Sequence, residues 1–323
     1  MLKAAILDDY QNVALSLADW DRLKGKVDFT VFTDNLADVD AVAKRLADFD
    51  IVIMNRERTP FLADLLQKLP KLKLLLTSGM VNRSIDVKAA NAQGIVVCGS
   101  LSSSSSTPEL AWGMIIALAR HIPREVRNLQ EGRWQETVGI GLKGRTLGII
   151  GLGHLGIPMA RVALAFDMKV AVWSPNMSQE RADKVMPGLK AVSKDEMMSG
   201  SDFITIHMPL GPRSIGIVSA ADIARMKPTA YLINTSRGPI VEQEALYKAV
   251  RENKIAGCAL DVYDIEPLPK DHPVRSLPNS VLTPHLGFVE VDAYKRHFAE
   301  AVDNIENWLA GKPSRVIEVI GPH

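Results

Sequence analysis

The chain has 323 residues, enough for two domains of ordinary size. Hydrophobic residues make up 47% of it and charged residues 23%, which excludes wholesale disorder and fibrous repeats. The 38 Lys and Arg residues nearly balance the 37 Asp and Glu residues, leaving a net charge of +1. The overall charge therefore shows no excess of positive residues that would indicate binding to nucleic acid or to an anionic membrane.

Two cysteines, Cys98 and Cys258, are too few for a disulfide framework. No Cys/His cluster has the spacing of a zinc site, so we expect no metal. Acidic residues follow the N-terminus too soon for a signal peptide, and no run approaches the roughly 18 apolar residues of a membrane span. We expect a cytoplasmic globular protein.

The first hundred residues alternate short apolar runs with longer amphipathic ones. The apolar runs predict buried strands at Ala4–Leu7, Val27–Phe32, Ile51–Met54, Leu72–Thr77 and Ile95–Cys98. Helices are predicted between them, as at Asp38–Ala47 and Phe61–Lys68. Such alternation favours a parallel sheet covered by helices on both faces.

Five consecutive serines, Ser102–Ser106, are typical of a surface linker. Thr107 then precedes Pro108 and Glu109, which predicts a helix start with a capping residue, a proline and an acid in the first turn. The apolar stretch Leu110–Ala119 continues as a buried helix. We interpret this segment as the crossing between two domains.

A second series of strands begins near residue 146. Its predicted members are Thr146–Ile150, Lys169–Trp173, Phe203–His207, Ala230–Asn234, Gly257–Val262 and Val281–Thr283. A last helix, Val291–Ala310, ends at a Gly and Pro stop signal, and we expect the tail Ser314–His323 to pack back on the first domain. The predicted domains are residues 1–100 with 291–323, and residues 101–290.

A glycine-rich turn joins the strand Thr146–Ile150 to the following helix. Its G-x-G-x-x-G pattern comprises Gly151, Gly153 and Gly156. The first glycine suits a tight turn, the second lets backbone amides approach a pyrophosphate, and the third allows close packing of helix and strand. A purely structural turn is the alternative, but the strand before and the helix after favour a dinucleotide site.

The acid that usually follows the second strand of such a site is missing. Trp173 and Ser174 occupy its place, and a serine does not repel a 2′-phosphate as a carboxylate does. The site is therefore open to NADP, with Arg181 as a candidate phosphate ligand. A solvated helix face for Arg181, and NAD with a weaker ribose contact, are the alternatives.

Polar residues follow three later strands, where open parallel sheets bind ligands. The segments are Asn234–Gly238, Asp261–Pro267 and Thr283–Gly287. Together with the glycine turn they resemble the D-isomer-specific 2-hydroxyacid dehydrogenase family, which includes phosphoglycerate dehydrogenases and glyoxylate/hydroxypyruvate reductases. The resemblance covers nearly the whole chain and includes His207–Leu210, Met226–Pro228, Tyr231–Leu246, Ile85–Asp86 and Ala89–Ala90.

This resemblance implies a fold, a cofactor and an assembly. The fold is α/β, with two doubly wound parallel-sheet domains: a Rossmann cofactor domain inserted in a flavodoxin-like substrate domain. The cofactor is NAD or NADP, and the partners are a small 2-hydroxy or 2-keto acid and a second copy in a homodimer, with no nucleic acid or membrane. Leu110–Ala119 is apolar enough for the dimer interface or for the core.

The family pattern also implies a catalytic set of Arg237, Glu266 and His285. His285 would exchange the hydroxyl proton as hydride moves to or from the cofactor, since histidine titrates near neutral pH. Glu266 would orient that imidazole and favour its charged form. Arg237 would bind the substrate carboxylate and polarise the keto oxygen.

Further residues are implied by the same resemblance. Asp261 matches the position that binds the nicotinamide carboxamide, and His207 is expected to shape its loop. The expected cofactor contacts are Thr107, Gly151, Gly153, His154, Leu155, Gly156, Trp173, Ser174, His207, Met208, Pro209, Thr235, Ser236, Asp261 and Gly287. The expected substrate contacts are Arg56, Gly79, Met80 and Arg237. Surface or packing roles are expected for His121, His154, His272, His297 and His323.

The substrate loop departs from the family pattern in two places. Val81 stands where a second glycine is usual, and Arg83 where an acid is usual. Arg58 or Arg83 could meet a second acidic group on the substrate, or could be ordinary surface charge. The sequence therefore does not name the acid.

Three alternatives to a hydroxyacid dehydrogenase stay open. The formate type of dehydrogenase has a glutamine where Glu266 stands, so the carboxylate counts against it. The phosphite type keeps a similar catalytic set. A dinucleotide-sensing corepressor-like adaptor would need a peptide groove and usually carries disordered extensions.

Overall fold

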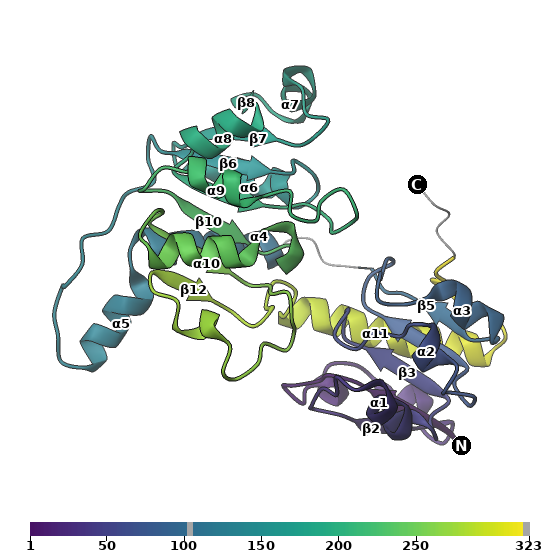
Figure 1. Cartoon of the computed structure of the whole chain (residues 1–323). Coiled ribbons are helices and arrows are strands. Elements are labelled where there is room, and N and C mark those ends of the chain that lie inside the picture. Colours follow the sequence, from purple (N-terminus) through teal and green to yellow (C-terminus); the bar gives the residue numbers. More distant parts are fainter. Residues whose placement is uncertain (102–105, 319–323) are drawn as a thin grey trace. The chain divides into compact units, whose positions relative to one another are not determined.

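The computed structural model describes residues 1–101 and 106–318 and divides into two compact units (Figure 1). Unit 1 comprises Met1–Ser103 with Glu290–His323, and unit 2 comprises Ser104–Val289. Each unit contains one parallel sheet with helices, so the predicted α/β fold class is confirmed. Within the described ranges, no helix combines the length and the apolar character needed to cross a bilayer.

Unit 1 is built on five parallel strands in the order β2-β1-β3-β4-β5, which is the flavodoxin-like arrangement. Its central strands are buried on both faces, as their continuous apolar sequences require. The strands are β1 (Leu2–Ile6), β2 (Val27–Val31), β3 (Ile51–Met54), β4 (Leu74–Thr77) and β5 (Val96–Cys98). The helices are α1 (Val39–Leu46), α2 (Ala63–Leu66), α3 (Val87–Ala92) and α11 (Val291–Leu309).

Helix boundaries in unit 1 follow local hydrogen bonding. The Asp38 carboxylate accepts a bond from the Ala41 amide at 2.8 Å, so α1 begins at the next residue, Val39. The helix predicted from residue 61 is shorter than expected. Phe61 lies outside α2, because it forms a parallel bridge with Ile85.

The last helix and the tail after it complete unit 1. Cys98 of β5 forms an antiparallel bridge with Val316, and the Ile317 amide donates to the Val97 carbonyl at 2.8 Å. The expectation that the tail packs on this unit is confirmed for these residues. The prediction for His323 lies outside the described residues.

Unit 2 is built on seven parallel strands in the order β12-β11-β10-β9-β6-β7-β8. The order reverses direction between β6 and β9, which is where dinucleotides bind in Rossmann folds. The strands are β6 (Thr146–Ile150), β7 (Lys169–Trp173), β8 (Leu189–Ala191), β9 (Phe203–Ile206), β10 (Tyr231–Asn234), β11 (Gly257–Leu260) and β12 (Ser280–Leu282). The helices are α4 (Ser106–Ala119), α5 (Ile122–Gln130), α6 (Gly156–Ala165), α7 (Gln179–Val185), α8 (Lys194–Gly200), α9 (Ala220–Arg225) and α10 (Gln243–Arg251).

Helix α4 begins one residue earlier than the predicted cap, Thr107. The helix already begins at Ser106, so Thr107 is not its cap, and the Thr107 hydroxyl instead donates to the Gly287 carbonyl at 2.8 Å. The linker prediction for Ser102–Ser106 falls, for residues 102–105, outside the described residues. Ala111, Ile115 and their apolar neighbours on α4 are buried within unit 2, so much of this stretch is core.

Candidate active site

The glycine turn after β6 has the close contacts that its sequence suggests. Gly151 has a φ of 95°, and a Cβ there would lie 2.4 Å from the His207 carbonyl oxygen. A Cβ on Gly156 would lie 2.1 Å from the Gly151 carbonyl oxygen. Gly153 has open space where its Cβ would be. Gly151 and Gly156 are thus required by packing, while Gly153 leaves the turn accessible from outside.

The turn lies directly beside the end of the neighbouring strand. The Gly151 amide donates to the Trp173 carbonyl at 2.8 Å, so Ser174 follows immediately next to the glycine turn. His154 is exposed and Leu155 is half-buried in the same turn. These five predicted cofactor residues therefore share one corner of unit 2.

Two buried polar atoms at the ends of β9 and β10 have no partner among the described residues. One is Nδ1 of His207, whose Nε2 lies 2.9 Å from the Thr205 hydroxyl. The other is the Thr235 hydroxyl. Burial lowers the pKa of His207 to about 4, so this imidazole is neutral near pH 7. Unsatisfied buried groups directly after β9 and β10 fit a site that a polar ligand completes.

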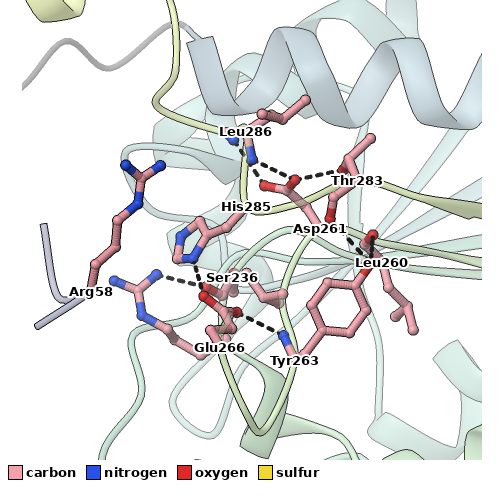
Figure 2. Close-up of polar contacts among 12 residues, drawn as sticks. Arg58, Ser236, Leu260, Asp261, Tyr263, Glu266, Thr283, His285 and Leu286 are labelled. Atoms are coloured by element: carbon pink, nitrogen blue, oxygen red, sulfur yellow. Dashed lines mark hydrogen bonds and ion pairs between the residues drawn. The ribbon is translucent and has the colours of Figure 1, made fainter. Parts of the chain in front are cut away.

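The strand ends of β11 and β12 bring a carboxylate and an imidazole into contact (Figure 2). His285 Nδ1 lies 2.5 Å from Glu266 Oε2. A carboxylate can only accept, so the proton of this bond resides on Nδ1. Nε2 has no hydrogen bond within the described ranges, and the His285 side chain is 17% exposed. The imidazole can therefore exchange a proton at Nε2 while Glu266 holds the other nitrogen.

The charge state of Glu266 is set by its neighbours. Burial raises its pKa, whereas the hydrogen bond and the charge of His285 lower it. The Tyr263 amide, which donates to Oε1 at 2.8 Å, and the charge of Arg237 act in the same direction. The net result is a Glu266 pKa below its usual range, which keeps the carboxylate ionised.

Asp261 fixes the loop that carries His285. Its Oδ1 accepts bonds from the Thr283 hydroxyl at 2.5 Å and the Leu286 amide at 2.7 Å. Its Oδ2 accepts a bond from the Gly287 amide at 2.8 Å. Burial raises the pKa of Asp261, while these bonds oppose the rise. Because His285 has a φ of 54°, these anchors hold a backbone conformation that L residues rarely adopt.

Arg237 is positioned by the loop after β10. Its Nη1 donates to the Ser236 carbonyl at 2.7 Å, and Nδ2 of the Asn234 side chain donates to the Arg237 carbonyl at 2.9 Å. The Ser236 hydroxyl donates to the Ile206 carbonyl at 2.7 Å, which ties this loop to β9. The next residue, Gly238, is so close to the following loop that its Cβ would lie 2.3 Å from the Tyr263 carbonyl carbon.

Gln243 is a supporting residue that the sequence reasoning missed. Its Oε1 accepts bonds from the Tyr247 hydroxyl at 2.8 Å and the Asp264 amide at 3.3 Å, and its amide donates to the Val262 carbonyl at 3.5 Å. It therefore braces the segment that leads to Glu266. A polar residue at the start of an amphipathic helix gave no signal that it would be buried.

In unit 1, three predicted substrate residues lie together. The Gly79 amide donates to the Ser100 hydroxyl at 3.3 Å, and a Cβ on Gly79 would lie 3.1 Å from Arg56 Nη1. Met80 follows with an exposed side chain, and its amide has no hydrogen bond within the described residues. Ser100 also lies 3.2 Å from Nδ1 of the buried His297, which thereby supports the Gly79 loop.

Arg58 and Arg83 differ in their surroundings. Arg58 Nη1 donates to the Asp8 carbonyl at 2.8 Å, and its guanidinium lies 4.6 Å from the Tyr10 ring centre. Arg83 is exposed. Across the described part of the chain, no group of three or more His, Cys, Asp or Glu side chains is arranged to hold a metal ion.

Comparison with known proteins identifies the family. The sequence model described as D-isomer specific 2-hydroxyacid dehydrogenase, NAD binding domain, matches residues 112–287. This range falls within unit 2 and includes the glycine turn, Arg237, Glu266 and His285. The chain belongs to the D-isomer specific 2-hydroxyacid dehydrogenase family.

Individual relatives agree with this assignment. The chain is 39% identical over 266 residues to a D-3-phosphoglycerate dehydrogenase of Synechocystis sp., covering 81% of this chain and 48% of that protein. It is 35% identical to a hydroxypyruvate reductase of Thermotoga maritima, covering 88% and 92%. A crystal structure of a phosphoglycerate oxidoreductase from Vibrio cholerae superposes with a TM-score of 0.91 at 38% identity, covering 96% and 100%. The chain thus spans about half the length of the phosphoglycerate dehydrogenases that it matches.

Proposed function

We propose that the chain is an NAD(P)-dependent oxidoreductase that interconverts small D-2-hydroxy acids and 2-keto acids. The observation that carries this proposal is the 2.5 Å contact between His285 Nδ1 and an ionised Glu266. It gives an imidazole one fixed nitrogen and one nitrogen available for proton exchange. The D configuration and the substrate class are supported by the family membership.

The chain's residues account for the proton that accompanies hydride transfer. When bound, the nicotinamide supplies or accepts the hydride at the substrate carbon. In the reductive direction, His285 donates its Nε2 proton to the keto oxygen, and Glu266 stabilises its position throughout. In the oxidative direction, the neutral imidazole takes the hydroxyl proton at the same nitrogen. Acid and base are thus the two protonation states of one residue.

Arg237 supplies the fixed positive charge. Its planar guanidinium suits the substrate carboxylate, and the bond from Nη1 to the Ser236 carbonyl fixes the position of this charge. A cation beside the keto oxygen also stabilises the negative charge that develops there during reduction. In unit 1, we propose that Met80 of the Gly79 loop supplies a backbone amide for the substrate and that Arg56, whose Nη1 lies beside Gly79, supplies a charge.

The cofactor would be held by unit 2. The amides of the turn around Gly153 suit a pyrophosphate, because that turn is open to solvent. The buried Thr235 hydroxyl and His207 Nδ1, both without partners in the described ranges, suit further polar contacts. Asp261 is committed to the His285 loop by three bonds, so its proposed contact with the nicotinamide carboxamide would add to a structural role.

The test is turnover of a panel of 2-keto acids with NADH and NADPH in parallel. The panel contains glyoxylate, hydroxypyruvate, pyruvate, phenylpyruvate and a branched 2-keto acid. We expect reduction of at least one acid, lost in His285→Ala but kept in His272→Asn. The matched control retains an acceptor for the Val274 amide, which His272 Nδ1 binds at 3.3 Å. Cofactor binding without turnover of any acid would contradict the proposal and would favour the phosphite-type enzyme or the sensing adaptor.

We also propose that the chain forms a homodimer through α5 and the segment after it. Ile122, Val126 and Leu129 are 43%, 51% and 61% exposed, and their spacing puts them on one helix face. Trp134 and Val138 follow with exposures of 76% and 93%. An exposed apolar surface of this extent on one segment is typical of an interface.

Light scattering tests the dimer. The wild type is expected at twice the chain mass, and Leu129→Asp at the mass of one chain. Gln130→Asp, a neighbouring exposed position, is expected to stay dimeric. A monomeric wild type, or a dimer that persists in Leu129→Asp, would contradict this interface.

A further inference from the structure

The segment that follows β7 carries no negative charge at the place where a cofactor's adenine ribose is recognised. In Rossmann folds a carboxylate after the second strand accepts bonds from the ribose 2′-hydroxyl and repels a 2′-phosphate. Here the segment from Ser174 to Ser178 contains no acid. The Gly151 amide is bonded to the Trp173 carbonyl at 2.8 Å, so Ser174 occupies the structural position of that carboxylate.

The guanidinium of Arg181 contacts the segment that follows β7. Arg181 lies in the first turn of α7, and its Nη1 donates to the Asn176 carbonyl at 2.7 Å. Because this partner is a carbonyl, the bond orients the guanidinium without neutralising it. Arg181 has no ion pair within the described residues.

The acids of α7 are occupied elsewhere. Glu180 is paired with Lys184 at 2.7 Å, and Asp183 accepts a bond from Gln179 at 2.7 Å. The turn is therefore left with one unneutralised guanidinium, a serine hydroxyl and no carboxylate. A phosphate dianion is the group that such a set recognises, because it accepts charge-assisted bonds from arginine.

We propose that this protein uses NADP(H) in preference to NAD(H), with Arg181 and Ser174 binding the 2′-phosphate. This inference rests on the proposed function only in requiring that unit 2 binds a nicotinamide dinucleotide. It assigns Arg181 a role in choosing the cofactor and none in the hydride transfer. Loss of Arg181 should therefore change cofactor affinity while leaving the chemistry of the His285–Glu266 pair intact.

The test is equilibrium binding of NADPH and NADH to the full chain, followed by nicotinamide fluorescence without any substrate. We expect NADPH to bind at least about tenfold more tightly, the effect of one charge-assisted hydrogen bond. Arg181→Ala should weaken NADPH binding by about tenfold or more and leave NADH binding within about twofold. Lys169→Ala, which removes an exposed cation at the opposite end of β7 from Ser174, is the control and should change neither affinity.

A second variant reverses the preference. Ser174→Asp restores the missing carboxylate and should make NADH the tighter ligand. The NADH affinity that Arg181→Ala is expected to keep excludes misfolding as the cause of its weaker NADPH binding. Tighter NADH binding by the wild type, or equal loss of both ligands in Arg181→Ala, overturns the inference while the dehydrogenase proposal stands. Failure to bind either cofactor overturns both.

Discussion

Unit 1 and unit 2 are both parallel α/β sheets, but Glu266 of unit 2 and Asp8 of unit 1 are partly buried carboxyl groups whose pKa values shift in opposite directions. In unit 2, Glu266 is held ionised by an imidazole, a backbone amide and an arginine. In unit 1, Asp8 is buried, and burial raises its pKa despite bonds from Asn35 and Thr59. The loops after the strands thus carry an ionised carboxylate bonded to an imidazole in unit 2 and a buried carboxyl in a polar network in unit 1.

This difference distinguishes a carboxylate suited to catalysis from a carboxyl group with a structural role. A carboxylate that stays ionised against an imidazole can assist proton transfer, whereas a buried carboxyl that bonds to Asn35 and Thr59 mainly holds loops together. Unit 1 has the Met80 amide on a loop braced by Ser100, and the Arg56 guanidinium lies beside Gly79 of that loop. We therefore expect unit 2 to determine turnover and unit 1 to determine substrate affinity.

The largest expected effect comes from removing the negative charge of Glu266 in unit 2. Glu266→Gln should lower kcat about 10³-fold, or roughly 4 kcal/mol, because a neutral amide no longer stabilises the protonated imidazole. Asp8→Asn is the matched change in unit 1 and should alter kcat less than about threefold. Steady-state kinetics on both variants measure this contrast. Similar losses of kcat in both variants would contradict the expectation that unit 2 alone determines turnover.

Each unit also contains one buried neutral histidine, and both should destabilise the fold in acid. Burial lowers the pKa of His207 and of His297 to about 4, below the ordinary value of 6.5. The unfolded state therefore takes up protons first. Stability is fully present above pH 6.5 and falls as the pH drops toward 4, by about 3 kcal/mol per histidine.

Urea unfolding at pH 7 and pH 4.5 checks this linkage. His207→Gln and His297→Gln should each lose less stability between these pH values than the wild type does. The double variant should show both reductions, since the two sites are in different units. If all four proteins lost the same unfolding free energy between pH 7 and pH 4.5, neither histidine would be linked to folding.

Close backbone approach in unit 2 gives a smaller effect. Gly238→Ala adds a Cβ 2.3 Å from the Tyr263 carbonyl carbon, so the loops that carry Arg237 and Glu266 must move apart. Unfolding free energy should fall by about 2 kcal/mol. Gly113→Ala, in α4 with open space around it, should instead raise it by about 0.5–1 kcal/mol. Thermal unfolding measures both variants. A Gly238→Ala variant as stable as the wild type, or a destabilised Gly113→Ala variant, would contradict this prediction.

The smallest expected effect is on substrate affinity through unit 1. Ser100→Ala removes the hydroxyl that accepts the Gly79 amide bond and contacts His297. The keto acid KM should rise about fivefold, the equivalent of one neutral hydrogen bond, with kcat within about twofold. Ser16→Ala, on the surface of the same unit, should leave both constants unchanged. A fall in kcat with constant KM would assign unit 1 a part in the chemistry.

The fold class was predictable because alternating apolar runs and amphipathic helices have few arrangements other than a doubly wound sheet. Strand β8 was missed, since only Leu189 of its three residues is buried and an edge strand needs no apolar run. Strand ends were predicted to within one or two residues. The expected strand Gly257–Val262 stops at Leu260, where the Asp261 side chain begins to anchor the next loop.

The site was predictable only where a residue's role is local. The three glycines of the turn could be interpreted from their spacing, because the pattern lies between a predicted strand and a predicted helix. The contact of Gly151 with the His207 carbonyl could not, since that residue follows another strand. The support of the Gly79 loop by His297 could not, since Ser100 and His297 are 197 positions apart. Likewise the contact of Glu266 with His285 came from a family resemblance, and no pattern along the chain indicates it.

The most direct test of the central claim is a double-mutant cycle on Glu266 and His285, with kcat measured for the best 2-keto acid. If the two residues act as one acid–base unit, Glu266→Gln should cause no further loss once His285 is alanine. The double variant should then equal His285→Ala within about twofold. Losses that multiply across the two variants would mean that Glu266 and His285 act independently, and would contradict the account.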